Sequence, residues 1–186
     1  MKGLVFSLLL VFPQLGLATS KVQPPGSVKV QIDTSMGDIV VQLDSRASIT
    51  IKNFLSYVDS GYYDGTIFHR VISNFMIQGG GMVPGLQEKK PQAPIQLEVG
   101  KGLSNVRGSV AMARTNAPHS ATSQFFINVK DNKRLDTAGG GYAVFGKVVQ
   151  GMDVVDKIKA VETTVRMGQR DVPVKPVMIK AVKRLP

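Results

Sequence analysis

Three segments of the chain hold the residues best suited to chemistry. They are FHRVISNFMIQGG at Phe68–Gly80, GSVAMARTNAPHSATSQFFIN at Gly108–Asn128, and YAVFGKV at Tyr142–Val148. The first combines an arginine, a glutamine and several Phe and Met side chains without paired carboxylates, which disfavours acid–base hydrolysis. The same inventory suits an apolar groove with a fixed cationic donor, which would orient the amide group of a neutral substrate.

The residue inventory excludes several common catalytic sites. The 186-residue chain has no Cys, which removes thiolate nucleophiles, redox dithiols and thiolate metal sites. Its two histidines, His69 and His119, are distant in the sequence, so neither a histidine-rich metal site nor a zinc site is expected. The G-x-S-x-G turn of a serine hydrolase is also missing. We interpret His69 as a structural hydrogen-bonding residue and His119 as an exposed residue of a turn.

Alternation of apolar and polar residues predicts that strands position most of these side chains. Strand-like runs occur near 28–32, 39–43, 67–72, 75–79, 95–98, 109–113, 124–129, 143–149 and 177–182. Within the 67–72 run, regular alternation places Phe68, Arg70 and Ile72 on one face of the sheet. His69 and Val71 then lie on the opposite face.

Two helices are predicted between these strands. Apolar residues recur at helical spacing from Ile51 to Val58, with Ser48 as N-cap and Gly61 as the stop signal, and a second helix is expected at about 152–160. Eight or nine short strands with two helices indicate a single mainly β domain, either a closed antiparallel barrel or a sandwich. The apolar strand residues expected to fill its interior are Val30, Ile32, Val41, Val110 and Val144.

The N-terminus has the three-part pattern of a secretory signal peptide. A positive start at Met1-Lys2 precedes the apolar run Leu4–Phe12, which is too short to span a bilayer, and Gly16 and Ala18 supply small residues for cleavage. We predict a cleaved signal peptide at 1–18, with cleavage after Ser20 as the second choice and an uncleaved anchor as the alternative. A Pro/Gly tether at 19–27 would lead into the domain at 28–186, in an exported protein of the bacterial periplasm or the secreted fraction.

The basic residues are in excess but scattered. The chain has 23 Lys and Arg against 13 Asp and Glu, and residues 101–186 hold 15 of the basic and 6 of the acidic ones. No three basic residues are consecutive, so we expect a solvated basic surface rather than a nucleic-acid site. The alternative is attraction of the mature chain, with charge 22 − 13 = +9 after loss of Lys2, to an anionic surface.

Taken in order, the three motifs FHRVISNFMIQGG, GSVAMARTNAPHSATSQFFIN and YAVFGKVVQGMDVVDKI resemble the cyclophilins, a family of peptidyl-prolyl cis-trans isomerases. The likeness runs from about Val28 to Val182 and is greatest to the exported bacterial members. It implies a closed eight-stranded antiparallel β-barrel capped by two α-helices, with a binding groove on its outer face.

The resemblance also assigns site residues by position. Arg70 matches the catalytic arginine, and Gln78 matches the residue that helps to place it and contacts substrate. The pocket for the proline ring corresponds to Phe75, Met76, Phe126 and Leu135. The strand that pairs with the substrate backbone, and the residue beside it, correspond to Ala113, Arg114, Thr115 and Gln124. Tyr142 falls where many relatives have a pocket-lining histidine.

The implied partners are proline-containing polypeptides, with no metal or cofactor, no membrane span and a monomer by default. Arg134 stands where well-known eukaryotic relatives have a tryptophan that contributes to cyclosporin binding, so weak binding of that drug is expected. A different class of function is a holdase, or peptide-binding module, in which isomerase activity is incidental to protein folding.

Overall fold

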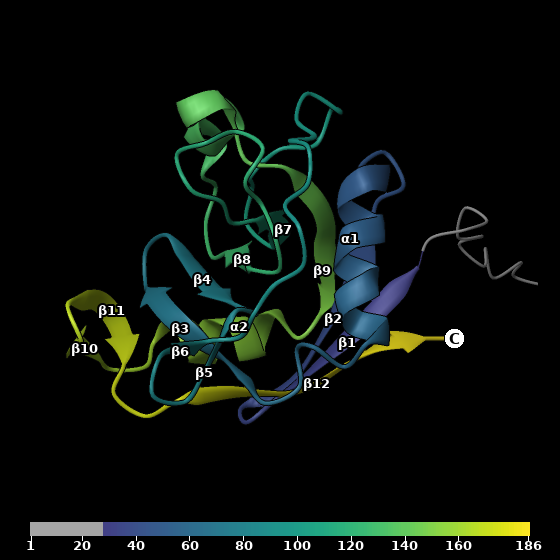
Figure 1. Ribbon diagram of the computed structural model, residues 1–186. Helices are drawn as coiled ribbons and strands as arrows, with labels where there is room; N and C mark the ends of the chain where they lie inside the picture. The colour runs from purple at the N-terminus through teal and green to yellow at the C-terminus, as the bar shows by residue number, and fades with distance from the viewer. Residues whose placement is uncertain (1–27) are drawn as a thin grey trace, which may run out of the picture.

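Eight strands close into a barrel in the computed structural model, which describes residues 28–186 (Figure 1). Around the barrel they are β1 (Lys29–Thr34), β12 (Val177–Leu185), β3 (Thr66–Ile72), β4 (Met76–Gly79), β8 (Phe125–Asn128), β7 (Ser109–Met112), β9 (Val144–Gln150) and β2 (Gly37–Leu43). Each neighbouring pair is antiparallel. The barrel prediction is therefore confirmed and the sandwich alternative is wrong. The expected signal peptide at 1–18 and tether at 19–27 lie outside the described residues.

Two short hairpins lie outside the barrel, and the sequence patterns did not predict them. They are β5 (Met82–Val83) with β6 (Gln87–Glu88), and β10 (Thr163–Arg166) with β11 (Gln169–Pro173). Two 3₁₀ turns, η1 (Lys133–Asp136) and η2 (Ala138–Gly140), form the loop that precedes β9. No helix within residues 28–186 is long and apolar enough to cross a membrane.

Both predicted helices are present, at opposite ends of the barrel. The first, α1 (Ser48–Asp59), packs where β2 ends, and its residues Ser48 and Leu55 line the same hollow as Leu43. The second, α2 (Met152–Lys159), packs where β2 begins, with Val154 against Gly37. Amphipathic burial positions both helices, because each directs its apolar face at the barrel interior.

The expected N-cap at Ser48 is wrong, because Ser48 is already helical and Ala47 occupies the cap position without a side-chain hydrogen bond. Glu98 supplies the missing acceptor from a distant loop. Its buried carboxylate accepts hydrogen bonds from the backbone N–H and the hydroxyl of Thr50, both at 3.0 Å. The first N–H groups of a helix have no partner within the helix, and the Glu98 carboxylate provides an acceptor for one of them. A negative charge at this end of a helix also interacts favourably with the helix dipole.

The predicted strand at 95–98 is also wrong. Ile95 forms only an isolated bridge with Ala121. The N–H of Leu97 donates to Nδ1 of the exposed His119 rather than to a neighbouring strand, and the Glu98 carboxylate binds the first turn of α1. This segment therefore contacts both α1, through Glu98, and the loop of His119, through Leu97.

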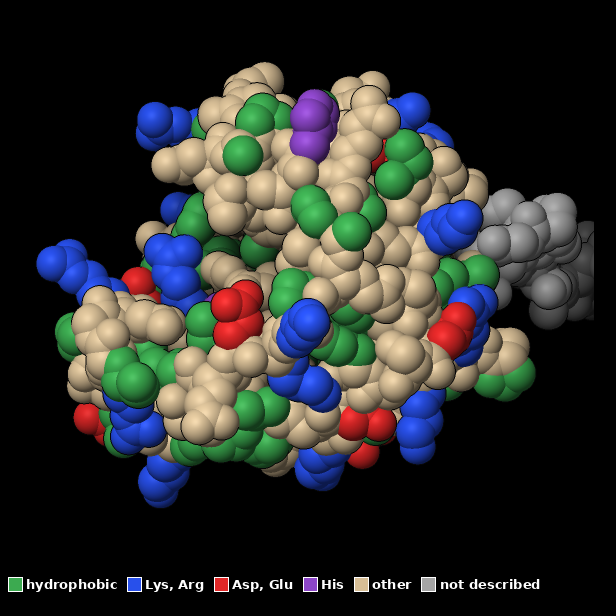
Figure 2. Space-filling model, viewed as in Figure 1, with side chains coloured by type: hydrophobic (Ala, Val, Ile, Leu, Met, Phe, Trp, Pro, Cys, Tyr) green, Lys and Arg blue, Asp and Glu red, His purple; other side chains and the backbone are tan. Residues whose placement is uncertain are grey.

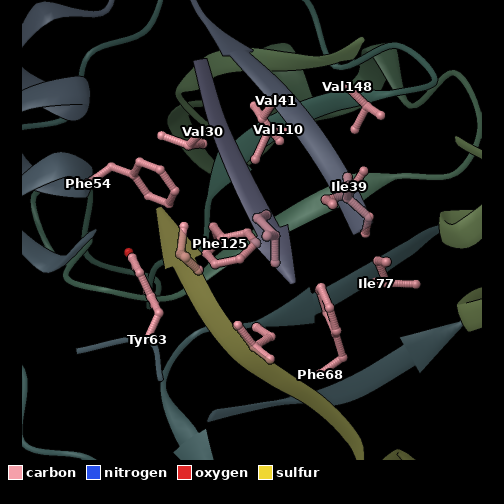
Figure 3. Close-up of a cluster of buried hydrophobic side chains, with 14 of the residues drawn as sticks. Val30, Ile39, Val41, Phe54, Tyr63, Phe68, Ile77, Val110, Phe125 and Val148 are labelled. Atoms are coloured by element: carbon pink, nitrogen blue, oxygen red, sulfur yellow. The ribbon is translucent and has the colours of Figure 1, made fainter. Parts of the chain in front are cut away.

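Aromatic rings close the α1 end of the barrel interior. Figure 3 shows Phe54 from α1 together with Tyr63 and Phe125. The Phe125 ring stands edge-on to the other two, with ring centroids 5.7 Å from Phe54 and 5.5 Å from Tyr63. Such perpendicular pairs add to the free energy of area burial. Apolar strand residues such as Val30 and Ile77 fill the rest of the interior.

Replacement of Glu98 by Ala is expected to lower the free energy of unfolding by about 2 kcal/mol, because it leaves the buried N–H of Thr50 without an acceptor. Urea unfolding followed by circular dichroism measures the change. The matched control is Glu162→Ala, which removes an exposed carboxylate and should stay within about 0.5 kcal/mol of the native chain. Equal losses in the two variants would contradict the capping role.

Candidate active site

A β-bulge turns Arg70 to the outside of the barrel. Phe68 pairs with Gly79 while Arg70 pairs with Gln78, so β3 has one extra residue, His69, at this point. Phe68 and Val71 therefore both face the barrel interior. The predicted alternation, with Phe68 and Arg70 on one face, is wrong because a bulge shifts the phase of a strand.

The register aligns Arg70 with the floor of a groove. Directly paired residues lie on the same face of a sheet, and the outward row runs across five adjacent strands: Arg70, Gln78, Phe126, Ala111 and Val144. The row is polar at its β3 end and apolar towards β9. Val144 thus packs with Ala111 and Phe126 in the apolar cluster outside the barrel, rather than in the barrel interior where the sequence analysis had placed it.

A cavity of about 200 Å³ opens at the end of this row formed by Arg70, Gln78 and Phe126. It gathers nine of the eleven expected site residues: Arg70, Phe75, Met76, Gln78, Ala113, Arg114, Phe126, Leu135 and Tyr142. The other two, Thr115 and Gln124, line an adjoining hollow of about 180 Å³ that shares Gln78, Ala113 and Arg114 with the first. A larger hollow, of about 540 Å³, lies against α1 and contains none of the eleven. The expected site residues therefore favour the two smaller, adjoining hollows as the candidate site over the larger hollow against α1.

The polar side of the groove is organised differently from the expectation. The side-chain amide of Gln78 donates a hydrogen bond to Gln124 Oε1 at 2.9 Å. Arg70, whose side chain is 44% exposed, instead has its Nε 3.7 Å from the Asp171 carboxylate of β11. Gln78 thus joins the two hollows, and Asp171 is the ionic neighbour of Arg70.

Arg114 and Tyr142 build the wall of the groove opposite Arg70. The Arg114 guanidinium lies 4.6 Å from the centroid of the Tyr142 ring, and its Nε donates to the backbone oxygen of Gly141 at 3.0 Å. The Tyr142 ring in turn stands edge-on to Phe126, with centroids 5.8 Å apart. The cation–π contact and the edge-to-face contact restrain the Tyr142 and Phe126 rings. The apolar lining of the cavity is therefore well packed on this side.

The buried His69 lies at the bulge beside Arg70. Burial, with a smaller contribution from the Arg70 charge, lowers the pKa of His69 to about 4. Its Nδ1 has no hydrogen-bond partner among residues 28–186, while hydrogen bonding to the Ile67 backbone and to the Gln124 side chain acts in the opposite direction and raises the pKa. The imidazole is therefore neutral at physiological pH and adds no positive charge to those of Arg70 and Arg114.

The part of the chain that the structure describes has no cluster of side chains suited to bind a metal ion. Residues 28–186 contain no group of three or more His, Asp or Glu side chains that could hold a metal ion. The groove itself is lined by two guanidinium groups, from Arg70 and Arg114, by the amide of Gln78 and by apolar side chains.

Residues 28–184 match the family model for "Cyclophilin type peptidyl-prolyl cis-trans isomerase/CLD". The chain belongs to the cyclophilin family. Two bacterial relatives are similar over nearly their whole length. A peptidyl-prolyl cis-trans isomerase of Streptomyces antibioticus is 59% identical over 84% of this chain and 98% of its own. Peptidyl-prolyl cis-trans isomerase B of Escherichia coli is 54% identical over 82% of this chain and 97% of its own.

Solved cyclophilin structures share the fold of this cyclophilin. A cyclophilin-type isomerase of Cryptosporidium parvum superposes with a TM-score of 0.77 at 28% identity, covering 87% of this chain and 99% of the other. The same protein in the presence of the dipeptide Ala-Pro gives a TM-score of 0.75 at 29% identity, covering 85% and 99%. Both agree with the eight-stranded barrel expected from the motifs.

Four residues of the groove were missed by the sequence analysis of this cyclophilin. Glu88, Ser120 and Thr122 line the smaller hollow, and Asp171 faces Arg70. Ser120 lies within the second motif, which was a usable signal. Glu88 and Asp171 lie in hairpins without strong alternation, so no local pattern pointed to them.

Between pH 6.5 and pH 4, His69 is expected to reduce the stability of this cyclophilin. The pKa of His69 is about 4 in the folded state and 6.5 in the unfolded chain, so protons bind preferentially to the unfolded chain as the pH falls through this window. This lowers the free energy of unfolding by up to about 3 kcal/mol. Above pH 6.5 the imidazole is neutral in both states and its contribution is constant. Urea unfolding at several pH values should give a flatter profile for His69→Gln. A constant difference between native chain and variant across the window would contradict the burial argument.

Proposed function

We propose that this cyclophilin accelerates rotation about Xaa-Pro bonds by using Arg70 to stabilise the twisted imide in the groove. One observation carries the proposal: the register places the Arg70 guanidinium in the same outward row as the apolar floor of a cavity of about 200 Å³. A cavity of this size is smaller than a drug-sized pocket and suits a single side chain.

The chemistry that this groove must perform is electrostatic. Amide resonance gives Xaa-Pro rotation a barrier of about 20 kcal/mol, and the resonance is lost in the twisted transition state. The imide nitrogen then regains a lone pair, to which a positioned guanidinium donates a hydrogen bond. Because both planar isomers lack this lone pair, the interaction stabilises the transition state selectively.

The other groove residues would bind and orient the substrate. Phe75, Met76, Phe126 and Leu135 would hold the proline ring, and the Tyr142 ring would close the wall beside them. Ala113–Thr115 follow the end of β7, where they would pair with the substrate backbone, while Gln78 and Gln124 would contact its amides. Shortening a step of tens of seconds to milliseconds requires roughly 6 kcal/mol of transition-state stabilisation. No covalent bond forms or breaks in this mechanism.

The proposed substrates are proline-containing segments of exported or unfolded polypeptides, and the proposed location is the periplasm. The N-terminal pattern at 1–18 supports export. Lys and Arg are spread among acidic side chains over the face in Figure 2, which supports a solvated surface rather than binding to nucleic acid. The structure of the Cryptosporidium parvum relative in the presence of Ala-Pro supports a proline ligand, and a monomer stays our default.

Arg70→Ala is expected to lower kcat/KM on a Xaa-Pro peptide at least tenfold, because it removes the donor to the twisted nitrogen. A fold-change of this size corresponds to about 1.4 kcal/mol of lost transition-state stabilisation. Protease-coupled isomerisation measures the rate, and circular dichroism checks that the variant is folded. Arg46→Ala, which removes an exposed arginine paired with Asp44 away from the groove, is the matched control.

Catalysis by a folded Arg70→Ala variant at the native rate would overturn the arginine mechanism. Retained peptide binding together with absent catalysis in the native chain would instead favour the holdase alternative. Both results are distinct from the expected one, in which only the Arg70 variant loses turnover.

Cyclosporin is expected to inhibit the native chain weakly, because the exposed Arg134 of η1 stands where relatives sensitive to the drug have an aromatic ring. Arg134→Trp should lower the inhibition constant at least tenfold through added apolar burial, with little change in turnover. Inhibition curves for the two chains measure the effect. An unchanged inhibition constant would contradict the assignment of this position.

A further inference from the structure

We propose that Asp171 is a positioning residue for Arg70, an inference that rests on the proposed function. Asp171 lies in β11 of the outer hairpin and reaches Arg70 Nε across 3.7 Å. The two residues come from separate sheets and belong to distant parts of the sequence. None of the three motifs contains Asp171.

A second β-bulge directs Asp171 towards Arg70. In the β10–β11 hairpin, Thr164 pairs with Val172 and Arg166 pairs with Gln169, so Arg170 and Asp171 together stand opposite the single residue Val165. Asp171 has a φ of +63°, in the left-handed region that few residues other than glycine adopt. Bulges re-aim side chains next to functional sites. Here the bulge of β11 and the bulge of β3 meet at one ion pair.

The hairpin is anchored at its base, close to Asp171. Val172 and Pro173 are buried, β11 lies in contact with β3, and the N–H of Val174 donates to the backbone oxygen of Glu162 at 2.9 Å. The tip is free by comparison, with the Met167 side chain 77% exposed. Asp171 is therefore held in its left-handed conformation by the anchored part of the hairpin.

The point of contact leaves the reactive side of the guanidinium available. A guanidinium has five N–H donors, and the carboxylate lies nearest to Nε. The two terminal nitrogens lie farther from this carboxylate and can serve the substrate in the groove that Arg70 lines. At 3.7 Å the attraction is ionic rather than a short hydrogen bond. Because both side chains are more than one-third exposed, it contributes little to stability but restrains the orientation of Arg70.

The decisive variant is Asp171→Asn, since asparagine also tolerates the left-handed backbone and differs only in charge and one atom. Exposed pairs have energies that correspond to about a two- to fivefold change in rate. We therefore expect kcat on an uncharged Xaa-Pro peptide to fall about two- to fivefold, with KM unchanged. Asp171→Gly, which accepts the same φ, should show the same loss. The matched control Asp59→Asn removes the exposed ion pair with Arg184 and should keep the native kcat.

A double-mutant cycle separates positioning from general structural damage. Lysine lacks the Nε of the fork, so Asp171→Asn should have less effect on kcat in an Arg70→Lys background than in the native chain. An equal loss in both backgrounds, a kcat for Asp171→Asn equal to that of Asp59→Asn, or full activity of Asp171→Gly would overturn the inference. If the native chain itself has no activity, the proposed function fails. If Arg70→Ala abolishes activity while Asp171→Asn leaves it intact, only the present inference fails.

Discussion

The arrangement of the whole groove depends on the β-bulge in β3, where His69 is the extra residue. Without it, strict alternation would turn the Arg70 guanidinium towards the interior that Phe68 and Val71 fill, where an unpaired charge is very costly. The bulge has its own cost, since His69 is buried and its Nδ1 has no hydrogen-bond partner in the described part of the chain. Because the imidazole stays neutral, the one charge of β3 at this site is the one that faces the groove.

The closed barrel makes this placement reproducible. Arg70, Gln78 and the floor residue Phe126 belong to different strands, yet they share one row because each strand is hydrogen-bonded to the next. A closed sheet has no free edge along which a strand can slip. Electrostatic catalysis requires groups fixed before the substrate arrives, and this register provides such fixation without a metal or a covalent intermediate in the mechanism we propose.

The sequence predicted the residues of the site better than their orientation. Nine of the eleven expected side chains lie around one cavity. Each motif contains a strand, and the pairing of these strands in the barrel brings the side chains together. The facing of Phe68 and the grouping of Val144 were wrong, since bulges and curvature do not show in alternation. Glu98 at α1 and Asp171 at Arg70 make contacts across long sequence separations, and no local pattern encodes such contacts.

The seam between β1 and β12 has a consequence for how the chain folds during synthesis. Lys29 pairs with Leu185, so the barrel cannot close until residue 185 has been synthesised. At roughly 5–20 residues per second, the first strand waits on the order of ten seconds for its partner. During that interval the nascent sheet exposes a free edge and one apolar face. Closure thus depends on contacts between strands far apart in the sequence, and such long-range contacts make it intrinsically slow.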